Sequence, residues 1–552
     1  MKIALAQINY HIGHFDSNVL KIKNAIQKAK QKGVDLIVFA EMAVSGYPPR
    51  DFLEFDDFIQ KCYQAIKEIA QSCIGIAAII GSPSINPSAK GKFLYNSAYF
   101  LYDGDIQYIT HKSLLPTYDI FDEYRYFEPF RDVNVLNYMG RKIALTICED
   151  IWDIGDERLY TISPMDVLAK QGPDLMVNIA ASPFHYRQAS SRREVLVRNA
   201  LRYNLPLFYV NHVGAQTELL FDGGSMVINR DGEIFDEFNY FEEDFRVYEL
   251  KEGSNQVSLF YSDFKPEKQK PESKISLIHD ALVMGIRNYF QKLSFSKAIL
   301  GLSGGIDSAV TLALAARALG NDNVKAVLLP SRYSSEHSIN DAVVLAENLN
   351  IPYDIIHIEK AFKSFEETMS QWFDGLPADI TEENLQARIR AVILMSLSNK
   401  FGYILLNTSN KSEAAVGYGT LYGDMCGGLS VLGDVYKTEV FDLARYINRS
   451  QPIIPEHTIS KPPSAELRPG QKDSDSLPDY EMLDQILYQY IELRKGPGDL
   501  IDQGYSEEIV SKVLKLVNTS EHKRYQMPPV LRVSTKAFGM GRRMPIVAKY
   551  LS

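Results

Sequence analysis

Short apolar runs dominate the first 250 residues, and helix-like stretches with apolar positions on one face lie between them. Two such stretches, Lys21–Lys32 and Phe58–Gln71, are predicted to be helices. The runs predicted to be strands are Ile3–Ile8, Leu36–Ala40, Ile74–Ile80, Ala98–Tyr102, Ile143–Ile147, Leu175–Ile179, Leu207–Val210 and Met226–Ile228. Many strands with few helical crossovers predict a mixed α/β arrangement, with two sheets packed together and helices outside.

The second half of the chain alternates more regularly, after a predicted helix over Ile275–Lys292. The predicted strands are Ala298–Leu300, Ala326–Leu329, Tyr353–Ile358 and Tyr403–Asn407, and the helices between them are Ala309–Leu319, Ser334–Leu349 and Leu385–Lys400. This alternation predicts a doubly wound parallel sheet, whose ligands bind at the carboxyl ends of the strands.

A polar, lysine-rich segment, Lys251–Lys274, separates the two patterns and contains Pro266 and Pro271. A chain of 552 residues exceeds what one core usually holds. We therefore predict a first domain over residues 1–250, a linker over 251–274 and a second domain over 275–552.

The composition of the chain argues against several classes of protein. The net charge of −10 argues against a nucleic-acid surface. The longest apolar runs are strand-sized, which argues against a membrane span, and polar residues interrupt the N-terminus too early for a signal peptide. The four cysteines, Cys62, Cys73, Cys148 and Cys426, include no Cys-x-x-Cys pair, which indicates a reducing cytoplasm.

A glycine-containing loop lies between the first predicted strand and helix of the second domain. Its residues are Gly301, Leu302, Ser303, Gly304, Gly305, Ile306, Asp307 and Ser308. Adjacent glycines let the backbone approach a ligand, and a helix N-terminus favours an anion such as phosphate. The loop is not of the Walker type, because Asp307 stands where that motif has lysine. A carboxylate fits here if Mg²⁺ lies between it and the phosphates.

Three chemically reactive side chains follow apolar runs in the first domain: Glu41, Lys112 and Cys148. If neighbouring strands are parallel, their ends converge, and the three residues can share one pocket. Together they supply a carboxylate base, a cation for an oxyanion and a thiol nucleophile. We also expect the nearby lysine to favour the thiolate.

These three residues and their contexts, with the Gly46–Pro49 turn, resemble the nitrilase (carbon–nitrogen hydrolase) superfamily over residues 1–250. The resemblance implies an α-β-β-α sandwich. The segment Lys112–Glu123 is similar to the glutaminase domain of glutamine-dependent NAD synthetases. That likeness implies that Tyr118 and Ser182 contact glutamine and that Glu123 helps to orient Lys112. The family's basic residue falls at Gln188, so that contact is expected from Gln188 or from Arg187 beside it.

The loop at Gly301–Ser308 resembles that of the ATP-pyrophosphatases (adenine nucleotide alpha hydrolase-like fold), which cleave ATP between its α- and β-phosphates. The segments Glu383–Arg388, Asn407–Glu413 and Gly417–Asp424 resemble the NAD synthetase pattern. The likeness implies that the loop and Thr408 bind ATP, and that Asp307 and Glu413 hold Mg²⁺. The residues implied for deamido-NAD⁺ are Asn384, Glu413, Tyr418, Gly419, Thr420 and Leu421, with either Arg532 or Lys536.

The resemblance in both halves implies a ligase that uses glutamine and ATP to convert deamido-NAD⁺ to NAD⁺, acting as a homo-oligomer. One alternative is another amidotransferase that uses the same loop on a different carboxylate. The other is a nucleotide-sensing protein that has lost its chemistry. The segments around Thr408 and Tyr418 count against the first, and the intact reactive residues count against the second.

Overall fold

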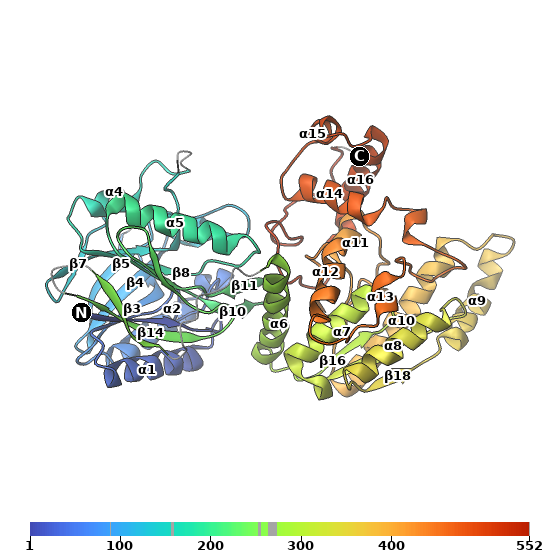
Figure 1. Cartoon of the computed structure of the whole chain (residues 1–552), viewed down its shortest axis with the longest axis horizontal. Coiled ribbons are helices and arrows are strands. Elements are labelled where there is room, and N and C mark those ends of the chain that lie inside the picture. Colours follow the sequence, from blue (N-terminus) through green and yellow to red (C-terminus); the bar gives the residue numbers. More distant parts are fainter. Residues whose placement is uncertain (89, 156–158, 252–255, 263–272, 551–552) are drawn as a thin grey trace. The chain divides into compact units, whose positions relative to one another are not determined.

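The computed structural model describes residues 1–88, 90–155, 159–251, 256–262 and 273–550. The chain forms two compact units, Met1–Glu272 and Ser273–Ser552. Each unit is shown in Figure 1 and described by itself here. No helix among the described residues has the length and apolar character that a bilayer crossing needs.

The described residues of the first unit contain two large sheets and a short hairpin. The seven-stranded sheet has the order β15 (Val257–Ser262), β14 (Asp244–Leu250), β1 (Lys2–Gln7), β2 (Leu36–Val38), β3 (Ala77–Ile85), β4 (Leu94–Tyr102), β5 (Asp105–His111). The six-stranded sheet has the order β13 (Ile234–Glu237), β12 (Met226–Ile228), β9 (Leu207–Asn211), β8 (Leu175–Ala180), β7 (Arg141–Ile147), β6 (Leu136–Tyr138). The hairpin is formed by β10 (Val213–Gln216) and β11 (Leu219–Asp222).

Helices cover the outer faces of these sheets. Figure 1 shows α1 (Phe15–Gln31) on one side of the strands, and α4 (Pro164–Ala169) and α5 (Gln188–Tyr203) on the other. Helix α2 (Asp56–Ala70) contacts β3 and β5. Short helical turns are η1 (Arg50–Glu54), α3 (Glu123–Tyr126) and η2 (Cys148–Ile151). The expected α-β-β-α sandwich is therefore confirmed.

The reactive residues each follow the carboxyl end of a strand, although β5, which precedes Lys112, pairs antiparallel with β4. Strands β1, β2 and β3 run parallel, as do β7, β8 and β9. Glu41 comes shortly after β2, Lys112 directly follows β5, and Cys148 directly follows β7. Lys112 belongs to the chain leaving one sheet and Cys148 to the chain leaving the other.

One part of the expected linker is a strand. Residues Val257–Ser262 form β15, which pairs antiparallel with β14 at the edge of the seven-stranded sheet. The residues on both sides of this short run are polar and lysine-rich, and they hide its strand character in the sequence. The rest of the predicted linker between the strand and the second unit, residues 263–272, lies outside the described residues, as do 252–255.

The second unit contains a sheet in which all described neighbours are parallel. Its order is β18 (Tyr353–Ile355), β17 (Val324–Leu328), β16 (Ala298–Gly301), β19 (Ile404–Asn407), β20 (Leu429–Ser430). The chain moves outward in one direction from β16 to β18 and then returns to place β19 on the other side. The doubly wound parallel sheet is confirmed, and its strand order reverses between β16 and β19, where such sheets bind ligands.

Helices of this unit cover the sheet and build a further apolar cluster. Helices α6 (Lys274–Lys292), α7 (Ile306–Leu319) and α12 (Lys437–Ile447) pack together, while α10 (Ile380–Phe401) contacts β16 and β19. Helices α11 (Lys411–Val416), α14 (Tyr480–Ile491) and α16 (Glu507–Thr519) share the cluster. The other helices are η3 (Asn321–Asn323), α8 (Glu336–Asn348), α9 (Glu359–Phe373), α13 (Glu456–Ser460), η4 (Asp473–Asp475), α15 (Pro497–Asp502) and α17 (Glu521–Arg524).

Candidate active sites

Lys112 lies between two carboxylates in the first unit. Its Nζ donates to Glu41 Oε1 and to Glu123 Oε1, each at 2.8 Å. The Lys112 and Glu41 side chains are both 0% exposed. Burial acts to lower the pKa of Lys112, but the charges of Glu123 and Glu41 outweigh it and raise that pKa well above its usual value. The structure thus holds a permanent cation beside Glu41, with Glu123 as its second partner.

The Glu41 side chain is fixed at both oxygens. Oε1 also accepts from Asn96 Nδ2 at 2.7 Å, and Oε2 accepts from the main-chain N–H of Ala181 at 2.8 Å. The residue's carbonyl oxygen lies 2.5 Å from His212 Nε2. Gly81 closes in from β3, where an added Cβ would lie 2.2 Å from the nitrogen of Met42. A carboxylate held in this way is positioned before substrate arrives.

Cys148 occupies a sharp bend where β7 ends. Its φ is +43°, a region that residues other than glycine seldom adopt, and its side chain is buried. The main chain around it is held by two hydrogen bonds: Ile147 N–H to Asp150 Oδ2 at 3.1 Å, and Asn178 Nδ2 to the Cys148 carbonyl at 3.4 Å. Strain of this kind concentrates at functional sites, where the surrounding structure imposes it.

The protonation of Cys148 is decided by burial, Glu41 and Lys112 together. Burial raises the pKa of the Cys148 thiol well above its usual value, the charge of Glu41 raises it further, and Lys112 opposes them only in part. Lys112 does favour the thiolate, as expected, because its charge lowers the pKa of Cys148, but burial and Glu41 outweigh it and keep the thiol protonated. A protonated thiol needs a base before it can attack, and Glu41 is a buried carboxylate whose charge acts on Cys148.

Two tyrosines face a carboxylate next to the nucleophile. Tyr118 donates its hydroxyl to both oxygens of Glu149 at 3.0 Å, and Tyr160 donates to Oε1 at 3.2 Å. Burial raises the pKa of Glu149 to about 7, although Lys112 and the two hydroxyls oppose it. These residues, with Trp152 and Arg198, line a cavity of about 310 Å³. The cavity offers an anionic group to a ligand cation.

Ser182 and Gln188 are in direct contact. Gln188 Nε2 donates to Ser182 Oγ at 2.9 Å, and the Ser182 N–H donates to Asn211 Oδ1 at 2.8 Å. Arg187 precedes α5, and its guanidinium carbon lies 5.7 Å from the centre of the Tyr186 ring. The uncharged Gln188, not Arg187, is thus the residue that contacts Ser182.

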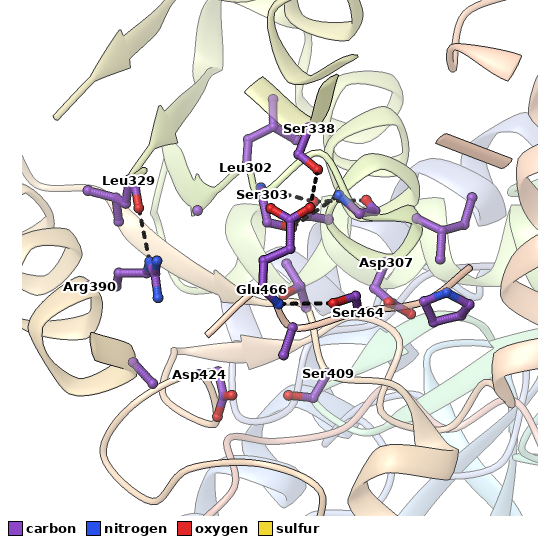
Figure 2. Close-up of a pocket in the computed structure, with 18 of the residues that line it drawn as sticks. Leu302, Ser303, Asp307, Leu329, Ser338, Arg390, Ser409, Asp424, Ser464 and Glu466 are labelled. Carbon is purple, nitrogen blue, oxygen red and sulfur yellow. Dashed lines mark hydrogen bonds between the residues drawn. The ribbon is translucent and has the colours of Figure 1, made fainter. Parts of the chain in front are cut away.

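In the second unit the glycine loop lines a cavity of about 320 Å³ at the carboxyl ends of β16 and β19. Gly304 has a φ of +80°, and an added Cβ would lie 2.1 Å from the carbonyl oxygen of Ser338, so a side chain is excluded here. Ser303 Oγ accepts from the Gly305 N–H at 3.2 Å. Figure 2 shows Ser303 and Asp307 on this cavity. The predicted ATP residue Thr408 lines it as well.

Lys437 lies between the two predicted magnesium ligands. Its Nζ is 2.5 Å from Asp307 Oδ2 and 3.3 Å from Glu413 Oε1. Asn410 Nδ2 donates to Asp307 Oδ1 at 2.9 Å. Burial raises the pKa of Glu413 to about 8, although the charge of Lys437 opposes this rise. The Lys437 ammonium thus supplies the positive charge between the Asp307 and Glu413 carboxylates.

This carboxylate pair fits a magnesium ion that arrives with a nucleotide. The described residues contain no group of three or more His, Cys, Asp or Glu side chains able to hold a metal. Mg²⁺ commonly uses one or two carboxylates together with substrate phosphates and water, so Asp307 and Glu413 are the residues that would hold it.

The residues expected to contact deamido-NAD⁺ occupy several places. Tyr418 lines the cavity with Glu413. Thr420 Oγ1 donates to Asn384 Oδ1 at 2.7 Å, which ties the segment to α10. The Gly419 carbonyl accepts from Lys523 Nζ at 2.8 Å, and the Leu421 carbonyl accepts from Arg388 Nε at 3.2 Å. The structure therefore brings Asn384 together with the Tyr418–Leu421 segment.

The C-terminal candidates are farther along the chain. Val530 forms a parallel bridge with Ser430, and this brings the following segment to the edge of the sheet. Arg532 is buried there, and its Nη2 donates to the Thr535 carbonyl at 3.3 Å. Neither Arg532 nor Lys536 is among the described residues that line the loop cavity. The choice between them stays open.

Comparison with known proteins matches both units. Residues 2–256 match the family model of carbon-nitrogen hydrolases, and residues 278–528 match that of NAD synthases. The chain is 43% identical over 557 residues to the glutamine-dependent NAD(+) synthetase of Synechocystis, with 99% of each chain covered. It is 39% identical over 581 residues to that of Thermotoga maritima, with 100% of this chain and 99% of the relative covered. The chain belongs to the glutamine-dependent NAD(+) synthetase family.

A solved structure supports the same assignment. The glutamine-dependent NAD+ synthetase of Acinetobacter baumannii, in complex with adenosine diphosphate, has a TM-score of 0.78 and 39% identity, and the match covers 99% of this chain and 98% of that one. The family resemblance inferred from the motifs is thereby confirmed over the full length.

Some side chains that shape these NAD synthetase sites escaped the sequence analysis. Asn96 was detectable as a polar residue within the apolar run of β4. Lys437 was detectable as a lysine at the first position of α12, where the helix dipole disfavours a cation unless another interaction compensates. Glu149 and Asp150 follow Cys148 directly, but the pattern of the sequence does not show which groups they contact.

Proposed function

We propose that this chain converts deamido-NAD⁺ to NAD⁺, with glutamine as the nitrogen source and ATP as the activating substrate. We assign the glutaminase step to the domain predicted over residues 1–250, extended by strand β15 (Val257–Ser262), and the synthetase step to residues 275–552. The proposal is carried by one observation: a buried Glu41–Lys112–Cys148 site and a glycine-loop cavity occur in one chain of this family.

In the glutaminase site, Glu41 accepts the proton of the Cys148 thiol as the sulfur attacks the side-chain amide of glutamine. The Lys112 ammonium stabilises the negative charge that develops on the amide oxygen. The proton held by Glu41 passes to the leaving nitrogen, and ammonia departs. Water activated by the same carboxylate then hydrolyses the thioester and releases glutamate.

Glutamine recognition is assigned to groups around the nucleophile. We infer that Glu149 binds the α-ammonium group of glutamine, since it is a carboxylate beside Cys148 that lines a cavity. Tyr118 would hold the Glu149 carboxylate in place and contact the substrate. Ser182 and Gln188 would provide neutral hydrogen bonds to its α-carboxylate, because the charged side chain of Arg187 lies against Tyr186.

In the synthetase site, the nicotinate carboxylate of deamido-NAD⁺ attacks the α-phosphate of ATP and releases pyrophosphate. The loop Gly301–Ser308 and Thr408 would bind the nucleotide, and Lys437 would contact its phosphates. Mg²⁺ held by Asp307 and Glu413 would neutralise charge on the phosphate oxygens. Ammonia then attacks the acyl-adenylate, which releases AMP and forms NAD⁺. Adenylation is needed because a carboxylate oxygen is a very poor leaving group.

The remaining assignments concern the deamido-NAD⁺ site, the oligomeric state and the cellular compartment. Asn384, Glu413 and the Tyr418–Leu421 segment are assigned to deamido-NAD⁺, with Arg532 or Lys536 as the cation. We also expect a cytoplasmic homo-oligomer. The family resemblance supports the oligomer, and four free cysteines suit a reducing compartment.

The test is NAD⁺ formation from deamido-NAD⁺, ATP and Mg²⁺, with either glutamine or ammonium chloride as the nitrogen source. We expect Cys148→Ala to lose the glutamine-driven reaction and to keep the ammonium-driven one. If the unmodified protein forms NAD⁺ from neither nitrogen source, the proposed function is wrong. ATP-dependent pyrophosphate release that requires deamido-NAD⁺ would exclude a protein that only senses nucleotides.

A further inference from the structure

A single buried carboxylate, Asp150, connects the two chain segments that carry Lys112 and Cys148. Its Oδ1 accepts from the main-chain N–H groups of Ser113 and Leu114, each at 2.9 Å. Its Oδ2 accepts from the main-chain N–H of Ile147 at 3.1 Å. The side chain is almost fully buried, so both oxygens are devoted to these protein donors.

The donors of these hydrogen bonds belong to chain segments that leave different sheets. Ser113 directly follows Lys112, after β5 of the seven-stranded sheet, whereas Ile147 ends β7 of the six-stranded sheet. The main chain of Lys112 is itself held on the first sheet, because its N–H donates to the Asn96 carbonyl at 2.8 Å. Asp150 therefore joins the segment that presents the cation to the segment that presents the nucleophile.

A purely local role accounts for only one of these three hydrogen bonds. Asp150 is the third residue of η2, and its bond to the Ile147 N–H is the cap of that turn. That cap needs one oxygen, and the other oxygen reaches two residues more than thirty positions away along the chain. Burying a carboxylate is costly unless hydrogen bonds compensate. Burial raises the pKa of Asp150 to about 7, while the three main-chain donors and Lys112 oppose this rise.

We propose that Asp150 is a positioning residue of the glutaminase reaction, which sets the placement of Lys112 relative to Cys148 by holding both main chains. This inference rests on the glutaminase function proposed above for the first unit. Asp150 acts without touching glutamine. Its effect is on the geometry at which the Lys112 ammonium meets the oxyanion formed by attack of the Cys148 sulfur.

The test compares Asp150→Asn with the unmodified full-length protein. Asparagine keeps the size of the side chain, but its NH₂ group must face either Ile147 or the Ser113–Leu114 pair, so one side of the link is lost. We expect kcat for glutamine hydrolysis to fall about 100-fold and KM to change by less than about threefold. Alkylation of Cys148 by iodoacetamide, followed by mass spectrometry, should change by less than about threefold, since it forms no oxyanion.

Asp174→Asn is a control at a more exposed carboxylate, whose Oδ1 also lies 3.9 Å from Arg141 Nη1. Asp174 Oδ2 accepts from the main-chain N–H of Lys142 at 2.8 Å, at the opposite end of β7 from Asp150, and both partners belong to the six-stranded sheet region. Its kcat should match that of the unmodified protein. A second variant, Asp150→Glu, keeps the charge and both acceptors but moves them by one methylene, and its kcat should also fall, by about tenfold.

Several results would overturn the inference. These are an unchanged kcat in Asp150→Glu or Asp150→Asn, a rise in KM alone, or a loss of kcat that Asp174→Asn reproduces. Loss of Cys148 alkylation together with kcat, and with a lowered midpoint of thermal unfolding, would assign Asp150 to folding alone. Absence of glutamine hydrolysis in the unmodified protein would instead refute the proposed function on which the inference rests.

Discussion

In Glu41→Gln the side chain keeps its length but changes its hydrogen-bonding capacity. Oε1 of Glu41 accepts from Lys112 and Asn96, and Oε2 accepts from the Ala181 N–H. A glutamine amide in either orientation therefore points its NH₂ group at a donor. It also cannot take the proton of the Cys148 thiol, which is the role we assign to Glu41.

The magnitude follows from these contacts. Loss of a general base lowers a rate by about 10²–10⁴-fold, or about 2.7–5.5 kcal/mol. Lys112 loses one carboxylate but keeps Glu123 at 2.8 Å. The loss of folding free energy should therefore be smaller than the about 3–5 kcal/mol expected when a buried charge is left without a partner.

In Glu41→Gln, the rate of Cys148 alkylation should rise, whereas the rate of glutamine hydrolysis should fall. The charge of Glu41 is one of the causes that raise the pKa of Cys148, second only to burial, so its removal lowers that pKa. Iodoacetamide should then alkylate Cys148 faster in Glu41→Gln at a given pH, while glutamate release from glutamine falls. Both rates are measured on the same preparation, with ammonium-driven NAD⁺ formation as the control for the second unit. Glutamate release within about tenfold of the unmodified protein would contradict the assignment of Glu41 as base, and so would slower alkylation.

Three further substitutions test one residue of each site and one buried ion-pair cluster of the second unit. Because burial raises the pKa of Glu149 to about 7, the carboxylate loses its negative charge as pH falls through that value, and KM for glutamine should rise on the acid side. Glu149→Gln should raise KM and remove this pH dependence. A pH dependence retained in the variant would contradict the proposed binding of the α-ammonium group by Glu149. Lys437→Met removes the cation between Asp307 and Glu413 and should raise KM for ATP by at least about tenfold in the ammonium-driven assay, with glutamine hydrolysis unchanged as the control. Lys411 Nζ lies 2.9 Å from Asp434 Oδ1 and 3.0 Å from Glu492 Oε1. Because Lys411→Met leaves both buried carboxylates without this cation, it should lower the free energy of unfolding by about 3–5 kcal/mol in urea titrations. A loss below about 1 kcal/mol would contradict a stabilising role for this ion-pair cluster.

In both sites, the functional residues that come directly after a predicted strand could be identified from the sequence. Glu41, Lys112 and Cys148 each come shortly after an apolar run that forms a strand, and the packing of the two sheets, which the local pattern does not show, completes the arrangement. The glycine loop was predictable for the same reason, since its residues connect an apolar run to a helix-like stretch. Local pattern and sheet topology are sufficient for predictions of this kind.

Other features depend on contacts that no local pattern records. The charge state of Cys148 is set by the balance among burial, Glu41 and Lys112, and that balance exists only when all three are assembled. Asp150 recognises main-chain N–H groups, which every residue except proline offers, so sequence cannot identify its partners. Lys437 meets Asp307 across a large separation along the chain, and its unfavourable place at a helix start was the only local signal.

The raised pKa of Cys148 also has a consequence for oxidative damage. Peroxides oxidise the thiolate and not the thiol, and buried sulfur atoms react more slowly than accessible ones. A nucleophile that stays protonated until glutamine is present and Glu41 takes its proton is therefore protected from sulfenic acid formation between turnovers. Saturating glutamine should keep this protection, since in the proposed mechanism the proton moves to Glu41 as the sulfur bonds to the amide carbon, and no free thiolate accumulates.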